Sequence, residues 1–215
     1  MTSDEFRQAE YWIDRHKRLR DDPRSVGNLA ATREQNEAGE IDFREAVSAA
    51  ARLLAPGRRT ILDLGCGYGR AAAGFIDAGF DYTGIDVSED AIQQAVGREP
   101  RGTFLRADLL QWVPDRTYDV VSVFYVLVHF VRDEDWGRFL DACCRAVAPG
   151  GRLLLADHFP TLRSGAAHFV SRPFDEYLPA LERHGLTIDQ DMAAGLVERL
   201  PASPHVRQFR FIARR

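Results

Sequence analysis

From Thr60 onward, short apolar runs alternate with stretches of helical periodicity, and this alternation limits the chain to few folds. Seven runs have the length and composition of β-strands. They are ILDL (61–64), YTGID (82–86), TFLRAD (103–108), VVSVFYV (120–126), RLLLADHF (152–159), LTID (186–189) and QFRFIA (208–213). Helical patterns fill the gaps near 70–78, 88–97, 133–147 and 173–184. Because most strands are continuously apolar, the sequence predicts a parallel sheet with helices on both faces.

The last two runs break the alternation, because the segment LVERLPASPHV between them has the composition of a loop. We therefore expect these two strands to form an antiparallel pair at one edge. The predicted fold class is α/β: a Rossmann-like three-layer sandwich with a seven-stranded, mostly parallel sheet, an antiparallel last strand and an N-terminal helical lid.

About 55 residues precede the sheet, and DFREAVSAAARLLA (42–55) has a helical pattern. The more polar part between Tyr11 and Glu40 is expected to fold over the sheet as a lid. We predict one structural unit, made of an N-terminal helical extension (1–55) and a sheet domain (56–215). A chain of 215 residues is long enough for one sizeable core.

Composition narrows the classes of partner. A formal net charge of −4 argues against nucleic acid or a membrane surface, both of which usually require a basic face. Cys66, Cys143 and Cys144 are too few and too badly spaced for a disulfide framework or a zinc site. The N-terminal segment is charged and has no apolar run typical of a signal peptide. We expect a cytoplasmic protein with a small-molecule partner, as a monomer or a homodimer.

A glycine-rich turn, within ILDLGCGYGR, follows the first strand directly. Its spacing is Gly65-x-Gly67-x-Gly69, whereas a dinucleotide fingerprint has its third glycine where this chain has Arg70. Asp63, just before the turn, would repel a pyrophosphate but suits a ligand that carries a cation. Ligands of open α/β sheets bind outside the carboxyl ends of the strands. The turn therefore indicates a cationic ligand without phosphate, and a tight turn that binds nothing is the alternative.

Two further acids end the second and third strands. Asp86 offers two oxygens that can accept from both hydroxyls of an adenosine ribose. Asp108 is placed to accept from the exocyclic amine of adenine, and the backbone N–H of Leu109 is placed to reach a ring nitrogen. The implied ligand has an adenine, a free ribose diol and an ammonium group. S-adenosylmethionine has all three.

Together these motifs resemble the class I S-adenosylmethionine-dependent methyltransferases over roughly residues 55–215. The resemblance rests on five motifs in the order of the family: LDLGCGYG (62–69), TGIDVS (83–88), ADL (107–109), YDVVSVFYVLVHF (118–130) and PGGRLLLAD (149–157). The seven-stranded sheet of the family, with its reversed final hairpin, agrees with the strands predicted above. The resemblance implies methyl transfer from S-adenosylmethionine to a small-molecule acceptor, with S-adenosylhomocysteine as product.

The resemblance also assigns residues to the donor. Asp63, Gly65 and Gly67 resemble the positions that hold the methionine moiety, and Val87 resembles the apolar neighbour of adenine. The predicted cofactor-binding set is Asp63, Gly65, Cys66, Gly67, Gly69, Asp86, Val87, Asp108, Leu109, Phe124, Tyr11, Trp12 and Arg15. Cys66 also fits a simpler interpretation, a small residue in a crowded turn.

The N-terminal stretch AEYWIDRH is typical of lids in small-molecule methyltransferases. In such lids, Tyr11, Trp12 or Arg15 would reach the carboxylate of the donor as the site closes. The alternative is an ordinary amphipathic helix, with both aromatic rings packed into a groove and the charges outside.

His129, just after the fourth strand, is the predicted catalytic base, since an ordinary imidazole titrates near neutrality. The alternative is that it orients the following helix or positions the substrate. His158, His168 and Arg172 follow the fifth strand and are predicted, with His129, to line the substrate site. The acidic ligands of a metal site are not evident, so no metal is expected.

The acceptor class is inferred from motifs that this sequence lacks. FYVLVH replaces the Asn/Asp-Pro-Pro-aromatic motif of nucleic-acid amino methylases, and no basic stripe or double-glutamate loop is visible. A small acceptor follows, methylated on oxygen, nitrogen or carbon, as in bacterial secondary metabolism. Two alternatives remain at this point: a methyltransferase-like fold used as a cyclase or non-catalytic binding protein, and an NAD-dependent oxidoreductase. The second lacks both the third glycine and a Tyr-x-x-x-Lys pair.

Overall fold

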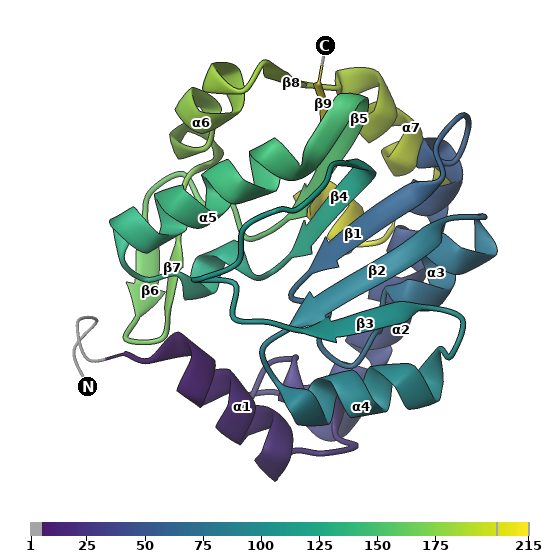
Figure 1. Cartoon of the computed structure of the whole chain (residues 1–215). Coiled ribbons are helices and arrows are strands. Elements are labelled where there is room, and N and C mark those ends of the chain that lie inside the picture. The colour runs from purple at the N-terminus through teal and green to yellow at the C-terminus, as the bar shows by residue number, and fades with distance from the viewer. Residues whose placement is uncertain (1–5, 201, 215) are drawn as a thin grey trace.

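A seven-stranded sheet forms the centre of the computed structural model, which describes residues 6–200 and 202–214 (Figure 1). The strands are β1 (Thr60–Leu64), β2 (Asp81–Asp86), β3 (Thr103–Arg106), β4 (Tyr118–Phe124), β5 (Val147–Ala156), β8 (Leu186–Ile188) and β9 (Phe209–Arg214). Their order is β3-β2-β1-β4-β5-β9-β8, and β9 is antiparallel to both of its neighbours. The predicted mostly parallel sheet with an antiparallel last strand is confirmed, although β9 lies inside the sheet and β8 forms the edge.

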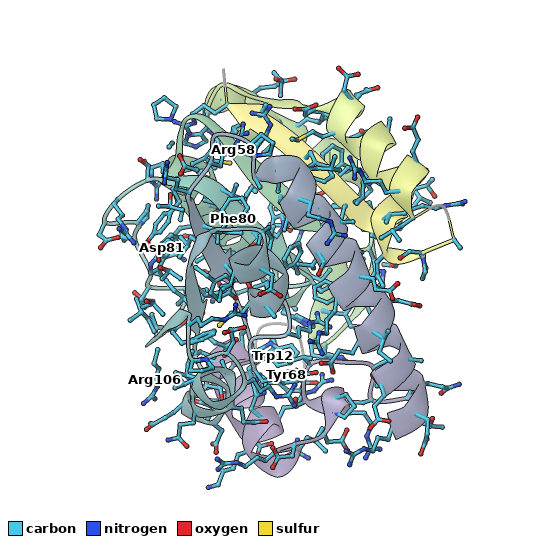
Figure 2. The ribbon with its side chains drawn as sticks, turned by 90° about the vertical axis from the view of Figure 1, so that its right-hand side faces the viewer. Trp12, Arg58, Tyr68, Phe80, Asp81 and Arg106 are labelled. Carbon is cyan, nitrogen blue, oxygen red and sulfur yellow. The ribbon has the colours of Figure 1, made fainter. Side chains whose placement is uncertain are left out.

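Helices cover both faces of this sheet. One face carries α2 (Arg33–Leu54), α3 (Ala72–Asp77) and α7 (Gln190–Arg199), and Figure 2 shows α2 running along it. The other face carries α5 (Asp133–Ala146) and α6 (Leu178–Arg183), while α4 (Glu89–Arg98) packs against β2 and β3. Along β4, Val120 packs toward α2, and Val121 packs toward α5. This burial on both faces explains why the strands read as continuous apolar runs.

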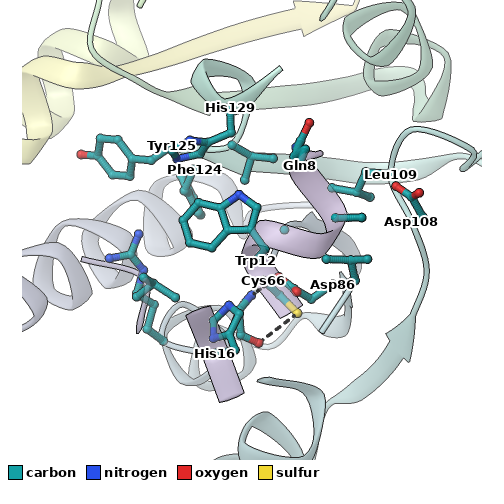
Figure 3. Close-up of a pocket in the computed structure, with 17 residues that line it drawn as sticks. Gln8, Trp12, His16, Cys66, Asp86, Asp108, Leu109, Phe124, Tyr125 and His129 are labelled. Carbon is teal, nitrogen blue, oxygen red and sulfur yellow. Dashed lines mark hydrogen bonds between the residues drawn. The ribbon is translucent and has the colours of Figure 1, made fainter. Parts of the chain in front are cut away.

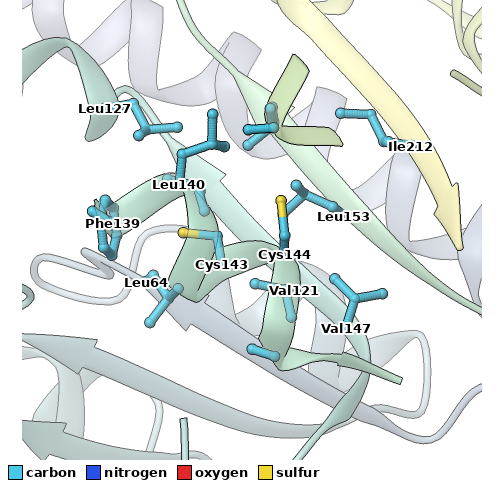
Figure 4. Close-up of a cluster of buried hydrophobic side chains, with 14 of the residues drawn as sticks. Leu64, Val121, Leu127, Phe139, Leu140, Cys143, Cys144, Val147, Leu153 and Ile212 are labelled. Atoms are coloured by element: carbon cyan, nitrogen blue, oxygen red, sulfur yellow. The ribbon is translucent and has the colours of Figure 1, made fainter. Parts of the chain in front are cut away.

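The core beneath α5 is shown in Figure 4. Leu140 and the free thiols of Cys143 and Cys144 pack against Val121 and Leu153 of the sheet. Both cysteines are fully buried and act here as small apolar side chains. The sheet therefore offers a rigid platform, on which the polar residues at the strand ends are held.

Two elements after β5 were not predicted. Helix α7 lies between β8 and β9, where the sequence indicated a loop. Asp189 is its N-cap, and the Asp189 carboxylate accepts from the backbone N–H of Met192. A short hairpin, β6 (Ser164–Ala166) and β7 (Phe169–Ser171), follows β5. Strands of three residues carry too few side chains for a periodic signal, so this hairpin was not visible in the sequence.

The N-terminal extension divides into two parts. Helix α1 (Gln8–Arg18) and the 3₁₀ turn η2 (Pro23–Ser25) lie outside the sandwich, whereas α2 is part of it through buried residues such as Phe43 and Leu54. Thr32 and Gln35 form a capping box at the start of α2. Three further 3₁₀ turns are η3 (Leu127–His129), η4 (Phe174–Glu176) and η5 (His205–Gln208). No helix in the described part of the chain is long and apolar enough to cross a membrane.

Candidate active site

A cavity, called here the first cavity, lies where the parallel strands end (Figure 3). The turn after β1, the tip of β2, the loop after β3, the tip of β4 and helix α1 all contribute to its wall. Its lining residues are Gln8, Ala9, Trp12, His16, Val26, Gly65, Cys66, Gly67, Arg70, Asp86, Val87, Asp108, Leu109, Phe124, Tyr125, Val126 and His129. The cavity lies outside the carboxyl ends of the strands, as the sequence predicted.

The glycine turn brings bare backbone to the cavity. Gly65 has φ of 77° and Gly67 has φ of 53°, which are left-handed conformations that glycine adopts without strain. A Cβ on Gly65 would overlap the side chain of Val126, and one on Gly67 would lie 2.9 Å from Val26. Gly69 does not line the cavity, because it faces Ala95 of α4. Gly65 and Gly67 are therefore the two glycines that a ligand can approach.

Asp86 joins the turn to the second strand. One of its carboxylate oxygens accepts from the backbone N–H of Gly67 and the other from that of Ser88, each at 2.9 Å. Ser88 in turn caps α4 by accepting from the N–H of Ala91. Each carboxylate oxygen has a second lone pair, so Asp86 retains acceptor capacity toward the cavity.

The other residues predicted to contact the adenosine and the methionine also line the cavity. Asp108 is partly exposed, and its Oδ1 accepts from the backbone N–H of Leu110 at 3.0 Å. Val87, Leu109 and Phe124 contribute apolar surface. Cys66 is buried in the turn, and burial raises the pKa of its thiol, so the sulfur is present as a neutral thiol.

Asp63 does not lie where the sequence placed it. Its side chain is not in the cavity wall, and its oxygens accept from the hydroxyls of Tyr82 at 2.6 Å and Ser122 at 2.8 Å. Burial raises its pKa to about 6, although both hydrogen bonds act in the opposite direction. Direct contact with a ligand is thus a correction: Asp63 supports the turn from behind.

Helix α1 contributes two aromatic side chains to the cavity. The Trp12 indole lies within it, with its ring centroid 4.7 Å from that of His129, as Figure 3 shows. His16 is 1% exposed, and its Nδ1 has no hydrogen-bond partner among the described residues. A buried polar atom without a partner is costly, so His16 is a residue that a ligand in this cavity would satisfy. Sequence reasoning had not selected it.

Arg15 is not available to a ligand in this conformation. Its guanidinium donates to the backbone oxygens of Arg24, at 2.7 and 3.1 Å, and of Gly27, and to the Tyr11 hydroxyl at 3.2 Å. Tyr11 itself stacks on His168 and does not line the first cavity. In this conformation both residues tie α1 to the neighbouring loops, and neither lines the first cavity.

Arg70 is the cation that faces the cavity instead. Its guanidinium lies 4.1 Å from the Phe43 ring centroid and 5.8 Å from that of Tyr125. Among the residues that the structure describes, it has no ion pair or hydrogen bond to another side chain. The sequence had marked position 70 only as a missing glycine. An arginine in place of that glycine was itself a signal for an anionic ligand group.

His129 is held by the β6–β7 hairpin. Its Nδ1 lies 3.1 Å from the backbone oxygen of His168, and since a carbonyl can only accept, Nδ1 carries the hydrogen. Nε2 is then the proton-accepting nitrogen. Burial lowers the pKa of His129 to about 4, so the ring is neutral near pH 7. That is the protonation state a base requires.

A second cavity adjoins the first and shares Trp12, Val26, Arg70, Tyr125 and His129 with it. It also contains two of the predicted substrate residues, His158 and His168, and one that was missed, His205. No three His, Cys, Asp or Glu side chains converge on a metal-like site within residues 6–200 and 202–214.

Tyr125 lines both cavities. Its φ is 59°, a left-handed conformation that is uncommon for a residue with a side chain. Its hydroxyl contacts Nδ1 of His205 at 2.7 Å and the side-chain oxygen of Gln208. Strained backbone of this kind is often found at functional sites.

Arg172 is a further correction. Its side chain is fully buried, donates to Asp133 at 2.8 Å and lies over the ring of Trp136, 4.8 Å from the centroid. It lines neither cavity, so it does not face a substrate in this structure. The sequence indicated Arg172 only because it follows β5. That position does not show that its side chain forms an ion pair with Asp133.

Asp157, at the tip of β5, bonds to the backbone beside two of these histidines, His129 and His158. Its carboxylate accepts from the N–H of His158 at 2.7 Å, from the N–H of Val128 and from the Tyr177 hydroxyl at 3.4 Å. Val128 precedes His129 in η3, so this one carboxylate is linked to the backbone of both imidazoles. Burial raises the pKa of Asp157 to about 7 despite these donors.

Comparison with known proteins agrees with this geometry. Residues 61–151 match the family profile described as a methyltransferase domain. Trans-aconitate 2-methyltransferase of Methylobacterium radiotolerans is 32% identical over 133 residues, which cover 60% of this chain and 48% of that protein. The mitomycin biosynthesis 6-O-methyltransferase of Streptomyces lavendulae is 28% identical over 176 residues, covering 73% and 50%. The chain spans about half the length of these curated relatives.

Solved structures extend the likeness to the whole fold. Magnesium protoporphyrin IX methyltransferase from Synechocystis PCC 6803, solved with bound S-adenosylmethionine, superposes with a TM-score of 0.70 over 98% of both chains. Its sequence is 19% identical, so this likeness establishes the fold and not the substrate.

The raised pKa of Asp157 predicts a pH-dependent contribution to stability. Between about pH 4 and 7 the folded state retains a proton that the unfolded state releases, so this contribution to the unfolding free energy falls as pH rises. Wild type should therefore lose stability relative to Asp157→Asn as the pH rises from 5 to 8. The difference between their unfolding free energies should change by on the order of 1–2 kcal/mol over this range. Denaturant titrations at both pH values measure it, with exposed Asp77→Asn as control. An unchanged difference would contradict the shift.

Proposed function

We propose that the chain is a class I S-adenosylmethionine-dependent methyltransferase and that it methylates a small-molecule acceptor. One observation carries the proposal: the glycine turn, Asp86 and Asp108 come from three successive strand ends and line a single cavity. The relatives that methylate trans-aconitate and act in mitomycin biosynthesis support a small acceptor and a role in bacterial secondary metabolism.

The side chains in the first cavity fit S-adenosylmethionine group by group. Asp86 would accept from the ribose hydroxyls, and the unpartnered Nδ1 of the neighbouring His16 would bond to the same region. Asp108 would accept from the adenine amine. Arg70, which replaces Arg15 in this role, would bind the donor carboxylate. Gly65 and Gly67 would bring their backbone to the methionine chain, since both line the cavity.

The same geometry disfavours a dinucleotide. In dinucleotide folds, the backbone N–H groups of the glycine turn and the helix that follows bind the pyrophosphate. Here the N–H of Gly67 is already bonded to Asp86, and α3 has only six residues. A pyrophosphate would meet the Asp86 carboxylate where it requires a donor.

The donor, when bound, supplies a methyl group already activated by a sulfonium charge. The protein's task is then to align the acceptor and to exclude water. His129 is proposed to take the proton of the acceptor at Nε2, while the His168 carbonyl fixes its ring. Asp157 holds the backbone of that turn in place.

Helix α1 is proposed to act as a lid. Trp12 already occupies the space between the two cavities, and Arg15 fastens the helix to the loop around Gly27. For ligands to enter, α1 has to move; once closed, it would shield the site from water. We also propose a cytoplasmic location, which the three free cysteines support, and a small molecule rather than nucleic acid or a membrane as partner.

Donor binding tests the core of this proposal. Calorimetric titration should detect S-adenosylmethionine and no binding of NAD. Asp108→Asn should weaken donor binding roughly tenfold or more, because an amide nitrogen then faces the adenine amine in place of a charged acceptor. Asp77→Asn, an exposed acid far from the cavity, serves as matched control. Tighter binding of NAD than of S-adenosylmethionine would refute the function.

Arg70 is predicted to recognise only the carboxylate of the donor. Arg70→Gln should weaken S-adenosylmethionine about tenfold or more and leave the affinity for methylthioadenosine, which has no carboxylate, unchanged. Arg163→Gln, in an exposed ion pair with Glu176, is the control. Equal losses for both nucleosides would instead indicate a general disturbance of the cavity.

His129 is predicted to act in turnover more than in binding. With the best acceptor from a metabolite screen, His129→Gln should lower kcat by about 10²–10⁴ while the Kd for S-adenosylmethionine changes little. Release of S-adenosylhomocysteine is the readout. His184→Gln, in a surface contact with Asp141, is the control. A near-normal rate in His129→Gln would remove its assignment as base.

A further inference from the structure

Imidazoles are concentrated in the two adjoining cavities. Five of the six histidines of the chain line one or both of them. His16 and His129 line the first cavity, and His129, His158, His168 and His205 line the second. The sixth, His184, pairs with Asp141 elsewhere on the surface. A surface so rich in one side chain constrains the chemistry of the molecule that it contacts.

Backbone carbonyls set which nitrogen carries the hydrogen in two of these rings. The His168 carbonyl requires a hydrogen on Nδ1 of His129, and the Gly39 carbonyl, 3.2 Å away, requires one on Nε2 of His205. Nε2 of His129 is therefore an acceptor, and Nδ1 of His205 lies 2.7 Å from the Tyr125 hydroxyl, which donates to the side-chain oxygen of Gln208. Burial lowers the pKa of His129, His158 and His205, so these rings are neutral near pH 7.

The second cavity has almost no negative charge to offer. Among the described residues that line it, Glu40 is the only carboxylate. Glu40 already accepts from the Tyr68 hydroxyl at 2.7 Å and pairs with Arg98 at 3.6 Å. Arg15 and Arg70 are the positively charged side chains that line this cavity. An ammonium group that entered this cavity would find cations and no free anion.

From this arrangement we propose that the acceptor atom is an acidic oxygen, that of a phenol, an enol or a carboxylic acid, and not an aliphatic amine. The inference rests on the proposed methyltransferase function and selects among its oxygen, nitrogen and carbon options. An aliphatic amine is protonated near pH 7, and its desolvated cation requires a carboxylate partner. An O–H group can donate to Nε2 of His129, and an oxyanion meets no free carboxylate in this cavity. Val26, Leu29 and Phe169 add apolar walls, which suit a ring-sized acceptor framework.

The reaction balances without any further reagent. The acceptor O–H bond breaks, its proton goes to Nε2 of His129, and the oxygen forms a bond to the methyl carbon. The electron pair of the broken sulfur–carbon bond remains on sulfur, which gives S-adenosylhomocysteine. An acceptor that enters as an oxyanion omits the proton transfer, and its oxygen attacks the methyl carbon directly.

Three probes of similar size test the inference by equilibrium binding: phenol, benzoate and benzylamine. Each is titrated by NMR into the protein saturated with S-adenosylhomocysteine, so that no turnover occurs. Phenol and benzoate should bind at least about tenfold more tightly than benzylamine, the order of effect expected for one uncompensated charge partly removed from water. Equal or tighter binding of benzylamine would overturn the inference.

A charge variant tests the same inference by changing the cavity while the three probes stay the same. Gln208 lines the second cavity beside His158 and Tyr125, and Gln208→Glu adds a carboxylate there with little change in shape. The preference for phenol and benzoate over benzylamine should fall by about tenfold or reverse. Gln190→Glu, at the exposed start of α7, adds the same charge outside both cavities and should leave the preference unchanged.

The outcomes separate this inference from the function on which it rests. If S-adenosylmethionine does not bind, the proposed function fails. If it binds but none of the three probes does, or if Gln208→Glu and Gln190→Glu alter the preference alike, the function stands and the inference is overturned. Mass spectrometry of turnover products adds a last check, because a methylated amine formed faster than a methylated oxygen contradicts the inference directly.

Discussion

The hydrogen bonds from the backbone of Gly67 and Ser88 to the Asp86 carboxylate are the constraint on which the donor site depends. They fasten the glycine turn after β1 to the tip of β2 and to the start of α4. Because the glycines there adopt left-handed conformations that other residues avoid, the turn has little intrinsic preference for one shape. The hydrogen bonds to the Asp86 carboxylate supply that preference. They also occupy the Gly67 N–H that a phosphate would need as a donor. One residue thus shapes the cavity and selects a nucleoside without a pyrophosphate.

Charge is distributed unequally between the two cavities, and this division gives each its role. The first contains Asp86 and Asp108, which suit hydroxyl and amine donors, whereas the second contains four imidazoles, two arginines and one carboxylate, Glu40, which is already bonded to Tyr68. Arg70, Tyr125 and Trp12 lie where the two cavities meet. A donor with a sulfonium group would add positive charge at this junction. The second cavity is therefore suited to a neutral or anionic acceptor on electrostatic grounds alone.

How well the sequence predicts each residue of the site depends on what determines the position of its side chain. Asp86 and Asp108 were predictable because parallel strands bring their carboxyl ends to one edge, so strand assignment alone brings them together. Arg15 and Arg172 were harder to place because long cationic side chains reach several partners, and here they bond to backbone carbonyls and to Asp133. His16 was missed because a histidine in a polar helix gives no sign that the fold will bury it. Tyr125 was missed because only the structure reveals its left-handed φ.

The β6–β7 hairpin shows why the catalytic part of the site was the hardest to derive. Its strands have three residues each, too few for a periodic pattern, yet the His168 carbonyl decides which nitrogen of His129 can accept a proton. Asp157 adds a second support, since its carboxylate accepts from the backbone N–H groups of Val128 and His158. The position of a histidine is visible in a sequence, but its tautomer and orientation come from main-chain groups elsewhere in the fold. Backbone carbonyls give no signal in a sequence pattern, so the chemistry of this imidazole follows from the tertiary structure.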